Sequence, residues 1–284
     1  MTVPVTGEES ITMFELISEM FSYSFLSRAV IVGILVALCA ALLGVTLVLK
    51  RYSMIGDGLS HVGFGAMSVA IAMNAAPLAV AIPVVVIAAF LLLRLSEKAK
   101  LKSDAAIALI STSALATGVI VTSLTSGLNA DIYSYMFGSI LAMRDGDVYL
   151  SLSVALVVLV LYVIFYNKIF AITFDEDFAQ ATGIKTRFYN VLIATLTALT
   201  VVVGMRIMGT MLISGLIIFP ALTAMRVCKS FRTVVIFSTV ISAVCFFAGM
   251  VLSYTLGTPA GASIVATNAL AFIIFFVIGK LSAK

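Results

Sequence analysis

Two ionisable residues inside an apolar stretch of the sequence have the spacing of one helical turn. Asp57 and His61 lie in the segment RYSMIGDGLSH, at the start of a hydrophobic run, and His61 is the only histidine of the chain. Residues i and i+4 of a helix share a face, so the carboxylate and the imidazole would point the same way. Such a pair suits Zn²⁺, or Mn²⁺ as the share of oxygen ligands rises. Two ligands do not close a metal site, but a homodimer that brings two pairs together could offer four.

Both residues also have ordinary structural interpretations. Asp57 follows Gly56 and precedes an apolar helical run, so it could be a helix N-cap, and His61 could be a hydrogen-bonded packing residue. Ionisable residues within membrane spans are rare and usually mark substrate pathways, which favours the functional interpretation. The depth of the pair depends on whether residues 52–56 enter the bilayer, because Arg51 lies only a few positions earlier.

The composition places the chain among helical membrane proteins. Of its 284 residues, 62% are hydrophobic and 11% are charged, whereas soluble domains carry about 25% charged residues. Long apolar runs separated by short polar loops predict an all-α, polytopic transmembrane bundle. The three isolated cysteines, Cys39, Cys228 and Cys245, are expected to be reduced packing residues.

Nine membrane spans are predicted from runs of about 20 apolar residues. They lie near residues 28–49, 57–74, 77–94, 104–124, 147–166, 188–204, 207–225, 233–253 and 261–279. Residues 131–143 are too few to cross and are predicted to be re-entrant or interfacial. We therefore expect eight or nine spans in a single transmembrane domain over 28–284, preceded by an extracytoplasmic or interfacial segment over 1–27.

The basic residues predict the orientation of the bundle. If Lys50 and Arg51 are cytoplasmic, the alternation of spans brings most of the 17 Lys and Arg residues to the same side. This distribution follows the positive-inside rule, with the N-terminus outside and the C-terminus inside. Basic clusters at span ends are topology signals, so the net charge of +4 does not indicate a nucleic-acid partner.

The longest polar stretch between spans, FDEDFAQATGIKTRF, predicts a short amphipathic helix from Asp175 to Gly183. Acidic residues favour the first turn of a helix, and glycine favours the position after its end. An apolar face of this helix could enter a groove of a partner protein, although a solvated loop with one helical turn is the alternative. The residues of interest in this segment are Phe174, Asp175, Glu176, Asp177, Phe178, Ala181 and Gly183.

Five segments in a fixed order resemble one family of membrane proteins. RYSMIGDGLSH, YSYMFGSILAM, FDEDFAQATGI, GMRIMGTMLISGLIIFPALTA and GTPAGASIV follow one another along the chain. Together they are similar to the permease subunit of the ABC-type metal-uptake family, the ABC-3 family, which imports zinc, manganese or iron. The resemblance covers almost the whole chain after residue 28.

The resemblance implies a role for each group of residues. Asp57 and His61 would face the translocation path and contact the ion in transit, while residues 175–183 would form the coupling helix that seats in an ATPase subunit. The family implies a homodimer in the cytoplasmic membrane of a bacterium or archaeon, with two cytoplasmic ATPases and an external metal-binding protein. The sequences of the first and third segments are most similar to the zinc branch of the family, so zinc is the favoured cargo. Manganese is the next candidate, and ferrous iron is also possible for these ligands. Gly58 departs from the alanine common in relatives, and no histidine-rich metal-sensing loop is present.

Other functions have weaker support in the sequence. No GxxxxGK[ST] phosphate-binding loop occurs, so we expect no enzyme activity in this chain, ATP bound by a separate subunit, and no cofactor besides the transported metal. An ion-gradient-driven secondary transporter would usually show internal repeats and paired intramembrane carboxylates. A membrane metalloenzyme would need more ligands than one histidine and one aspartate, and HExxH is absent.

Two further residues within apolar segments are conspicuous. Arg206 could pair with an acid such as Asp131, although extension of its side chain to the outer interface is the favoured interpretation. Pro220 is expected to kink the span that contains it.

Overall fold

The computed structural model describes residues 19–98, 103–125 and 145–282, and all regular secondary structure in these ranges is helical. The predicted all-α bundle is therefore confirmed. The predicted re-entrant segment, 131–143, and most of the predicted N-terminal segment, 1–27, lie outside the described residues.

Each of the nine predicted spans coincides with one long helix. These helices are α2 (Ser24–Leu49), α3 (Ile55–Ala72), α4 (Pro77–Lys98), α5 (Ser103–Leu124), α7 (Asp145–Ile164), α10 (Thr186–Met208), α11 (Thr210–Val227), α12 (Phe231–Leu256) and α13 (Ala260–Ser282). Two short helices, α8 (Tyr166–Phe174) and α9 (Glu176–Ala181), connect α7 to α10.

Seven of these helices are long and apolar enough to cross a membrane; of the other two, α11 is also apolar, whereas α3 has a lower hydropathy. Each of the two has 18 residues. The sequence of α3 explains its lower hydropathy, because it contains Asp57, His61 and four glycines. A helix with this composition must pack against neighbouring helices, so that its polar residues do not face lipid.

One predicted break between spans is wrong. The sequence suggested a break at residues 204–207, but α10 continues through Gly204 and Arg206 to Met208. The chain instead turns at Gly209, whose φ of 88° is a conformation that glycine adopts without the steric penalty of a side chain. Pro220 lies inside α11, and the kink expected there stays a prediction.

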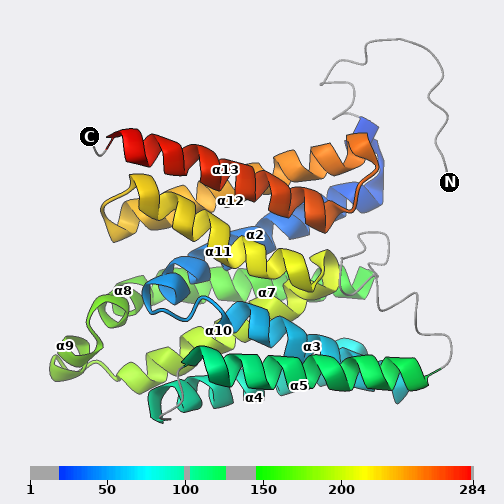
Figure 1. The fold of residues 1–284 in the computed structure, drawn as a ribbon, viewed down its shortest axis with the longest axis horizontal. Coiled ribbons are helices and arrows are strands. Elements are labelled where there is room, and N and C mark those ends of the chain that lie inside the picture. Colours follow the sequence, from blue (N-terminus) through cyan, green and yellow to red (C-terminus); the bar gives the residue numbers. More distant parts are fainter. Residues whose placement is uncertain (1–18, 99–102, 126–144, 283–284) are drawn as a thin grey trace.

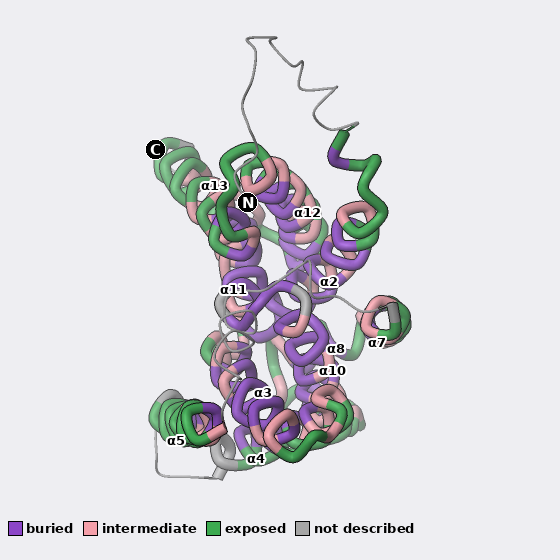
Figure 2. Tube along the Cα trace, turned by 90° about the vertical axis from the view of Figure 1, so that its right-hand side faces the viewer, coloured by how far each residue is buried: buried purple, intermediate pink, exposed green. Residues whose placement is uncertain are grey.

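The helices run along the long axis of the molecule, with α9 at one end and the N-terminal end of α2 at the other (Figure 1). We call the first of these the α9 end. The buried positions concentrate in α2, α3, α10 and α11, whereas α5, α7 and α13 are largely exposed at the periphery (Figure 2). Exposed apolar side chains on the outer helices are suited to contact with lipid.

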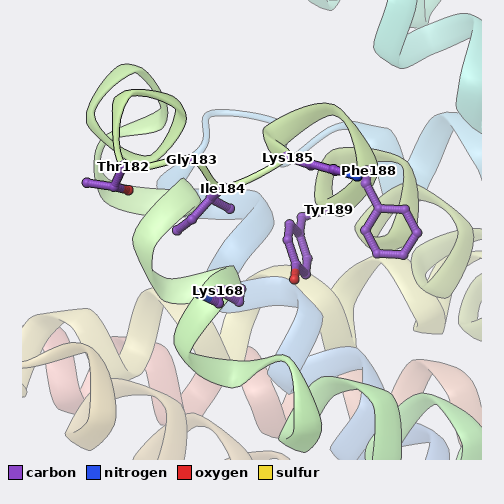
Figure 3. Close-up of a pocket in the computed structure, with 7 residues that line it drawn as sticks. All are labelled: Lys168, Thr182, Gly183, Ile184, Lys185, Phe188 and Tyr189. Atoms are coloured by element: carbon purple, nitrogen blue, oxygen red, sulfur yellow. The ribbon is translucent and has the colours of Figure 1, made fainter.

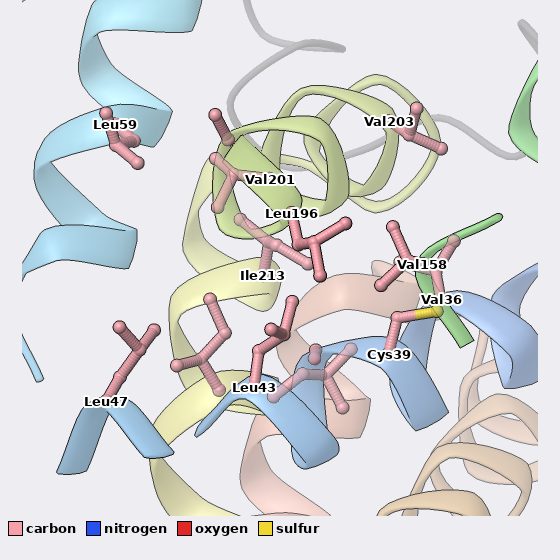
Figure 4. Packing of buried hydrophobic residues seen from close by; sticks show 14 of the residues in the cluster. Val36, Cys39, Leu43, Leu47, Leu59, Val158, Leu196, Val201, Val203 and Ile213 are labelled. Carbon is pink, nitrogen blue, oxygen red and sulfur yellow. The ribbon is translucent and has the colours of Figure 1, made fainter. Parts of the chain in front are cut away.

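The core forms where α2 meets α7, α10 and α11 (Figure 4). Cys39 of α2 lies there beside Val36 and Val158, and its Sγ is 3.4 Å from the carbonyl oxygen of Ala155 in α7. All three cysteines are free thiols, as expected from their spacing.

Glycine lets α3 approach its neighbours closely. A Cβ atom on Gly65 would lie only 2.5 Å from the carbonyl oxygen of Ala114 in α5, and this backbone atom cannot rotate away. Small residues at helix contacts are the usual means of close packing in membrane bundles. The close packing of α3 against α5 therefore depends on the absence of a side chain at this position.

Replacing Gly65 by alanine should destabilise the protein, because the added methyl group forces α3 and α5 apart. Overpacking of this kind typically costs about 1–3 kcal/mol, so the thermal unfolding midpoint of the detergent-solubilised protein should fall. Gly146→Ala in α7 is the matched control, since no heavy atom lies within 4 Å of the added methyl group. Equal midpoints for the two variants would contradict the packing argument.

Candidate functional site

The predicted pair lies on one face of α3. The Nε2 atom of His61 is 3.6 Å from the Oδ2 atom of Asp57, four residues earlier. Asp57 is in the first turn of the helix but is not its N-cap, because the N-cap residue is Met54. The capping interpretation of Asp57 is therefore wrong, although a carboxylate in the first turn still interacts favourably with the helix dipole.

A serine from another helix orients the aspartate. The hydroxyl of Ser214 in α11 donates a hydrogen bond of 3.1 Å to Oδ1 of Asp57. This bond leaves Oδ2 directed toward His61. Ser214 was missed at the sequence level, because a serine in an apolar helix is common and gives no signal of its partner.

The contact with Ser214 also sets the depth of the pair. Ser214 lies one turn after Gly209 and about 20 Å, at 1.5 Å per residue, from the end of α11 at Val227. That end of α11 is at the α9 end of the bundle (Figure 1). Asp57 and His61 therefore lie within the bundle, away from the basic residues of the α9 end.

The pair is partly accessible to solvent, and one of its nitrogen atoms has no hydrogen-bond partner among the described residues. The side chains of Asp57 and His61 are 40% and 26% exposed, although they lie inside the length of the bundle. The Nδ1 atom of His61 is buried and has no hydrogen-bond partner among the described residues. No third His, Cys, Asp or Glu joins the pair in the part of the chain that the structure describes. A metal ion bound by this pair would therefore need further ligands from water or from a second molecule.

The predicted amphipathic helix is present as α9. The carboxylate of Asp175 accepts a hydrogen bond of 2.8 Å from the backbone N–H of Phe178 and so caps the helix. The helix ends at Ala181, and Gly183 follows with a φ of 85°. The acidic start and the glycine after the end therefore act as the sequence indicated.

The residues of this segment divide into an outer and an inner set. Phe174, Asp177, Phe178 and Ala181 are exposed, and their role in docking stays a prediction. Glu176 points inward: its Oε1 accepts from Nδ2 of Asn190 at 2.6 Å, and its Oε2 accepts from Nζ of Lys50 at 3.0 Å. The predicted docking set is thus split, because Glu176 holds α9 against the bundle.

An open cavity of about 430 Å³ separates this segment from the start of α10 (Figure 3). Lys168, Lys185, Phe188 and Tyr189 line it, together with residues 182–184. It lies at the α9 end, so it is not part of the space around Asp57 and His61.

Arg206 forms an ion pair within the protein. Its guanidinium is 3.3 Å from Oδ2 of Asp147 in α7, and the two side chains are only 14% and 17% exposed. Extension of this side chain to the interface is therefore the wrong interpretation, and the acid that it meets is Asp147. The other acid considered, Asp131, lies outside the described residues.

Comparison with known proteins identifies the class of this chain. Residues 22–279 match the model of the ABC 3 transport family, and the chain belongs to this family. It is a multi-pass permease subunit of an ABC-type metal transporter.

Individual relatives agree with this assignment. The chain is 32% identical to the manganese import system permease protein ScaB of Streptococcus gordonii over 264 residues, which are 93% of this chain and 95% of the relative. It is also 32% identical to a probable iron transport system membrane protein of Haemophilus influenzae over 265 residues, 93% of each chain. The solved structure of PsaBC from Streptococcus pneumoniae in complex with Fab has a TM-score of 0.83 at 30% identity, covering 93% of this chain and 95% of that one. The first two of these relatives are named for manganese and for iron, so they give no specific support to zinc.

Replacing Arg206 by methionine should destabilise the permease, because it removes the guanidinium that faces Asp147 where both side chains are largely buried. Breaking one partner of such a pair costs roughly 3 kcal/mol. The double variant Arg206→Met/Asp147→Asn should recover most of the loss in thermal unfolding midpoint. If the double variant is as unstable as the sum of the two single variants, the ion pair is not the source of the effect.

Proposed function

We propose that two copies of this permease form the membrane path of an ATP-driven importer for a divalent transition metal ion, with Mn²⁺ as the principal cargo. The observation that carries the proposal is the Asp57–His61 pair, oriented by Ser214 and partly open within the bundle. An external binding protein would deliver the ion, and two cytoplasmic ATPases would drive its passage.

The ligand chemistry favours a homodimer. Each chain contributes a carboxylate oxygen and an imidazole nitrogen, so two facing pairs supply four donors to an ion in transit. Water in the partly open site completes the coordination shell, which suits an ion that must also be released. Mn²⁺ accepts such an oxygen-rich set, and the names of several relatives agree with it. Zn²⁺ and Fe²⁺ are the competing cargoes for the same ligands.

The cytoplasmic face of the permease would be the α9 end. Basic residues gather there, as the positive-inside rule requires of the cytoplasmic side. Those in the described part of the chain are Lys50, Arg51, Arg94, Lys98, Lys168, Lys185, Arg187, Arg226, Lys229, Arg232 and Lys280. This orientation directs the N-terminal end of α2 outward and the C-terminal end of α13 inward.

The exposed face of α9 would be the docking site for the ATPase. Phe178 is 66% exposed on a helix that is capped at its start and fixed to the bundle by Glu176. A rigid, apolar projection of this kind suits insertion into a groove of a partner. A transporter driven by an ion gradient would have no use for such a projection, which favours the ATP-driven mechanism.

The metal-ligand role predicts loss of transport without loss of assembly. In proteoliposomes that contain the permease, its ATPase and its binding protein, Asp57→Asn and His61→Ala should abolish ATP-dependent Mn²⁺ uptake. Ser214→Ala should weaken the apparent affinity for Mn²⁺ by roughly tenfold, because it removes the group that orients a ligand. Ser68→Ala, two turns further along α3, is the control and should transport normally. Normal Mn²⁺ uptake by either ligand variant would contradict the proposal.

The docking role of α9 predicts weaker binding of the ATPase. Phe178→Ala should lower the affinity of the detergent-solubilised permease for its ATPase by at least about tenfold, as expected for a central aromatic contact. Phe25→Ala, an exposed phenylalanine at the opposite end of the bundle, is the matched control. Equal affinities of the two variants, measured by interferometry, would exclude this face as the docking site.

A further inference from the structure

A single buried lysine connects α9 to the helix that precedes the metal pair. Lys50 is the C-cap residue of α2, and its side chain is only 9% exposed. Its Nζ donates to three oxygens: the carbonyl of Ile172 in α8 at 3.3 Å, Oε2 of Glu176 in α9 at 3.0 Å and Oδ1 of Asn190 in α10 at 2.7 Å. An ammonium group has three hydrogens, so this arrangement uses all of them.

The three side chains form a closed network. Asn190, which is 5% exposed, also donates to Glu176 at 2.6 Å, so Lys50, Glu176 and Asn190 are each bonded to the other two. The carbonyl of Ile172 belongs to the last turn of α8, where helical carbonyls lack intrahelical partners. Lys50 therefore fixes the end of α8 and the start of α9 at the same time.

The chain between Lys50 and the metal pair is short and internally bonded. The backbone N–H of Tyr52 donates to the carbonyl of Leu47 at 2.8 Å, and that of Ile55 donates to Tyr52 at 3.0 Å. These bonds close a turn in which Arg51 has a φ of 62°, a conformation unusual for a residue other than glycine. The first turn of α3, which contains Asp57, follows directly. Because this turn is short and held by hydrogen bonds, a displacement of Lys50 would also displace the first turn of α3 and, with it, Asp57.

We propose that Lys50 is a positioning residue that couples the movement of α9 to the geometry of the Asp57–His61 pair. The inference rests on the proposed function, because it requires that an ATPase moves α9. The Lys50–Glu176 ion pair is weak evidence for a contribution to stability, because the Glu176 side chain is 41% exposed and partly exposed ion pairs contribute little. Its donors and acceptors do fix relative position, and this pair joins the coupling helix to the element that precedes the ligands. Coupling between distant sites needs a contiguous physical link, and the Glu176–Lys50 contact completes one.

The test compares coupling with assembly in the reconstituted complex of permease, ATPase and binding protein, with Mn²⁺ as the probe. Lys50→Met should retain assembly, basal ATP hydrolysis and Mn²⁺ binding by the resting complex. It should reduce stimulation of the ATPase by the Mn²⁺-loaded binding protein and ATP-dependent uptake by more than tenfold. Lys185→Met, which removes an exposed lysine from the open cavity at the same end, should leave all of these unchanged (Figure 3).

A charge exchange adds a second, independent comparison. Lys50→Glu/Glu176→Lys keeps the attraction between the two positions and should restore a substantial part of the stimulation that each single variant loses. Normal stimulated hydrolysis and uptake in Lys50→Met would overturn the inference, as would a parallel loss of assembly and transport that the exchange fails to repair. Absence of ATP-dependent uptake by the unmodified complex would instead overturn the proposed function, and the inference with it.

Discussion

A polar group inside a membrane-spanning bundle must find its partner within the protein, because the surrounding hydrocarbon supplies none. The described polar contacts of this permease follow from that constraint. At the α9 end, Lys50 donates hydrogen bonds to acceptors in α8, α9 and α10. Near the opposite end, Arg206 forms an ion pair with Asp147. Between them, the Asp57–His61 pair receives only the hydroxyl of Ser214 and keeps ligand atoms unused. Ser238 Oγ and Asn268 Oδ1 are also buried without a hydrogen-bond partner, but of the three ionic contacts described here the Asp57–His61 pair is the one that an ion could complete.

The same constraint explains which helices are central. α3 contributes the pair and α11 contributes Ser214, and the Asp, His and glycine residues of α3 keep its hydropathy below that of a typical span. α3 is tolerated because α4, α5, α10 and α11 pack against it, and Gly65 allows its close approach to α5. The outer helices α5, α7 and α13 are largely exposed (Figure 2), and many of their exposed side chains are large and apolar.

The sequence predicted the features that depend on local pattern and not those that depend on distant contacts. Apolar run length located all nine long helices, and Asp175 and Gly183 marked the limits of α9 because capping acts within a few residues. The bond between Ser214 and Asp57 joins residues 157 positions apart, and Lys50 and Asn190 are 140 apart. Neither a serine nor an asparagine in a helix reveals such a partner. The misplaced break arose because Gly204 serves helix packing against Ile213, whereas Gly209 makes the turn.

The most direct measurement is the energy source and ion preference of transport by the unmodified complex. Proteoliposomes would be offered Mn²⁺ with Zn²⁺ and Fe²⁺ as competitors, with ATP, without ATP, and with an imposed proton gradient alone. The account predicts that Mn²⁺ accumulates only with ATP and that excess Zn²⁺ or Fe²⁺ reduces its uptake less than excess unlabelled Mn²⁺ does. Accumulation that follows the proton gradient and ignores ATP would contradict the account.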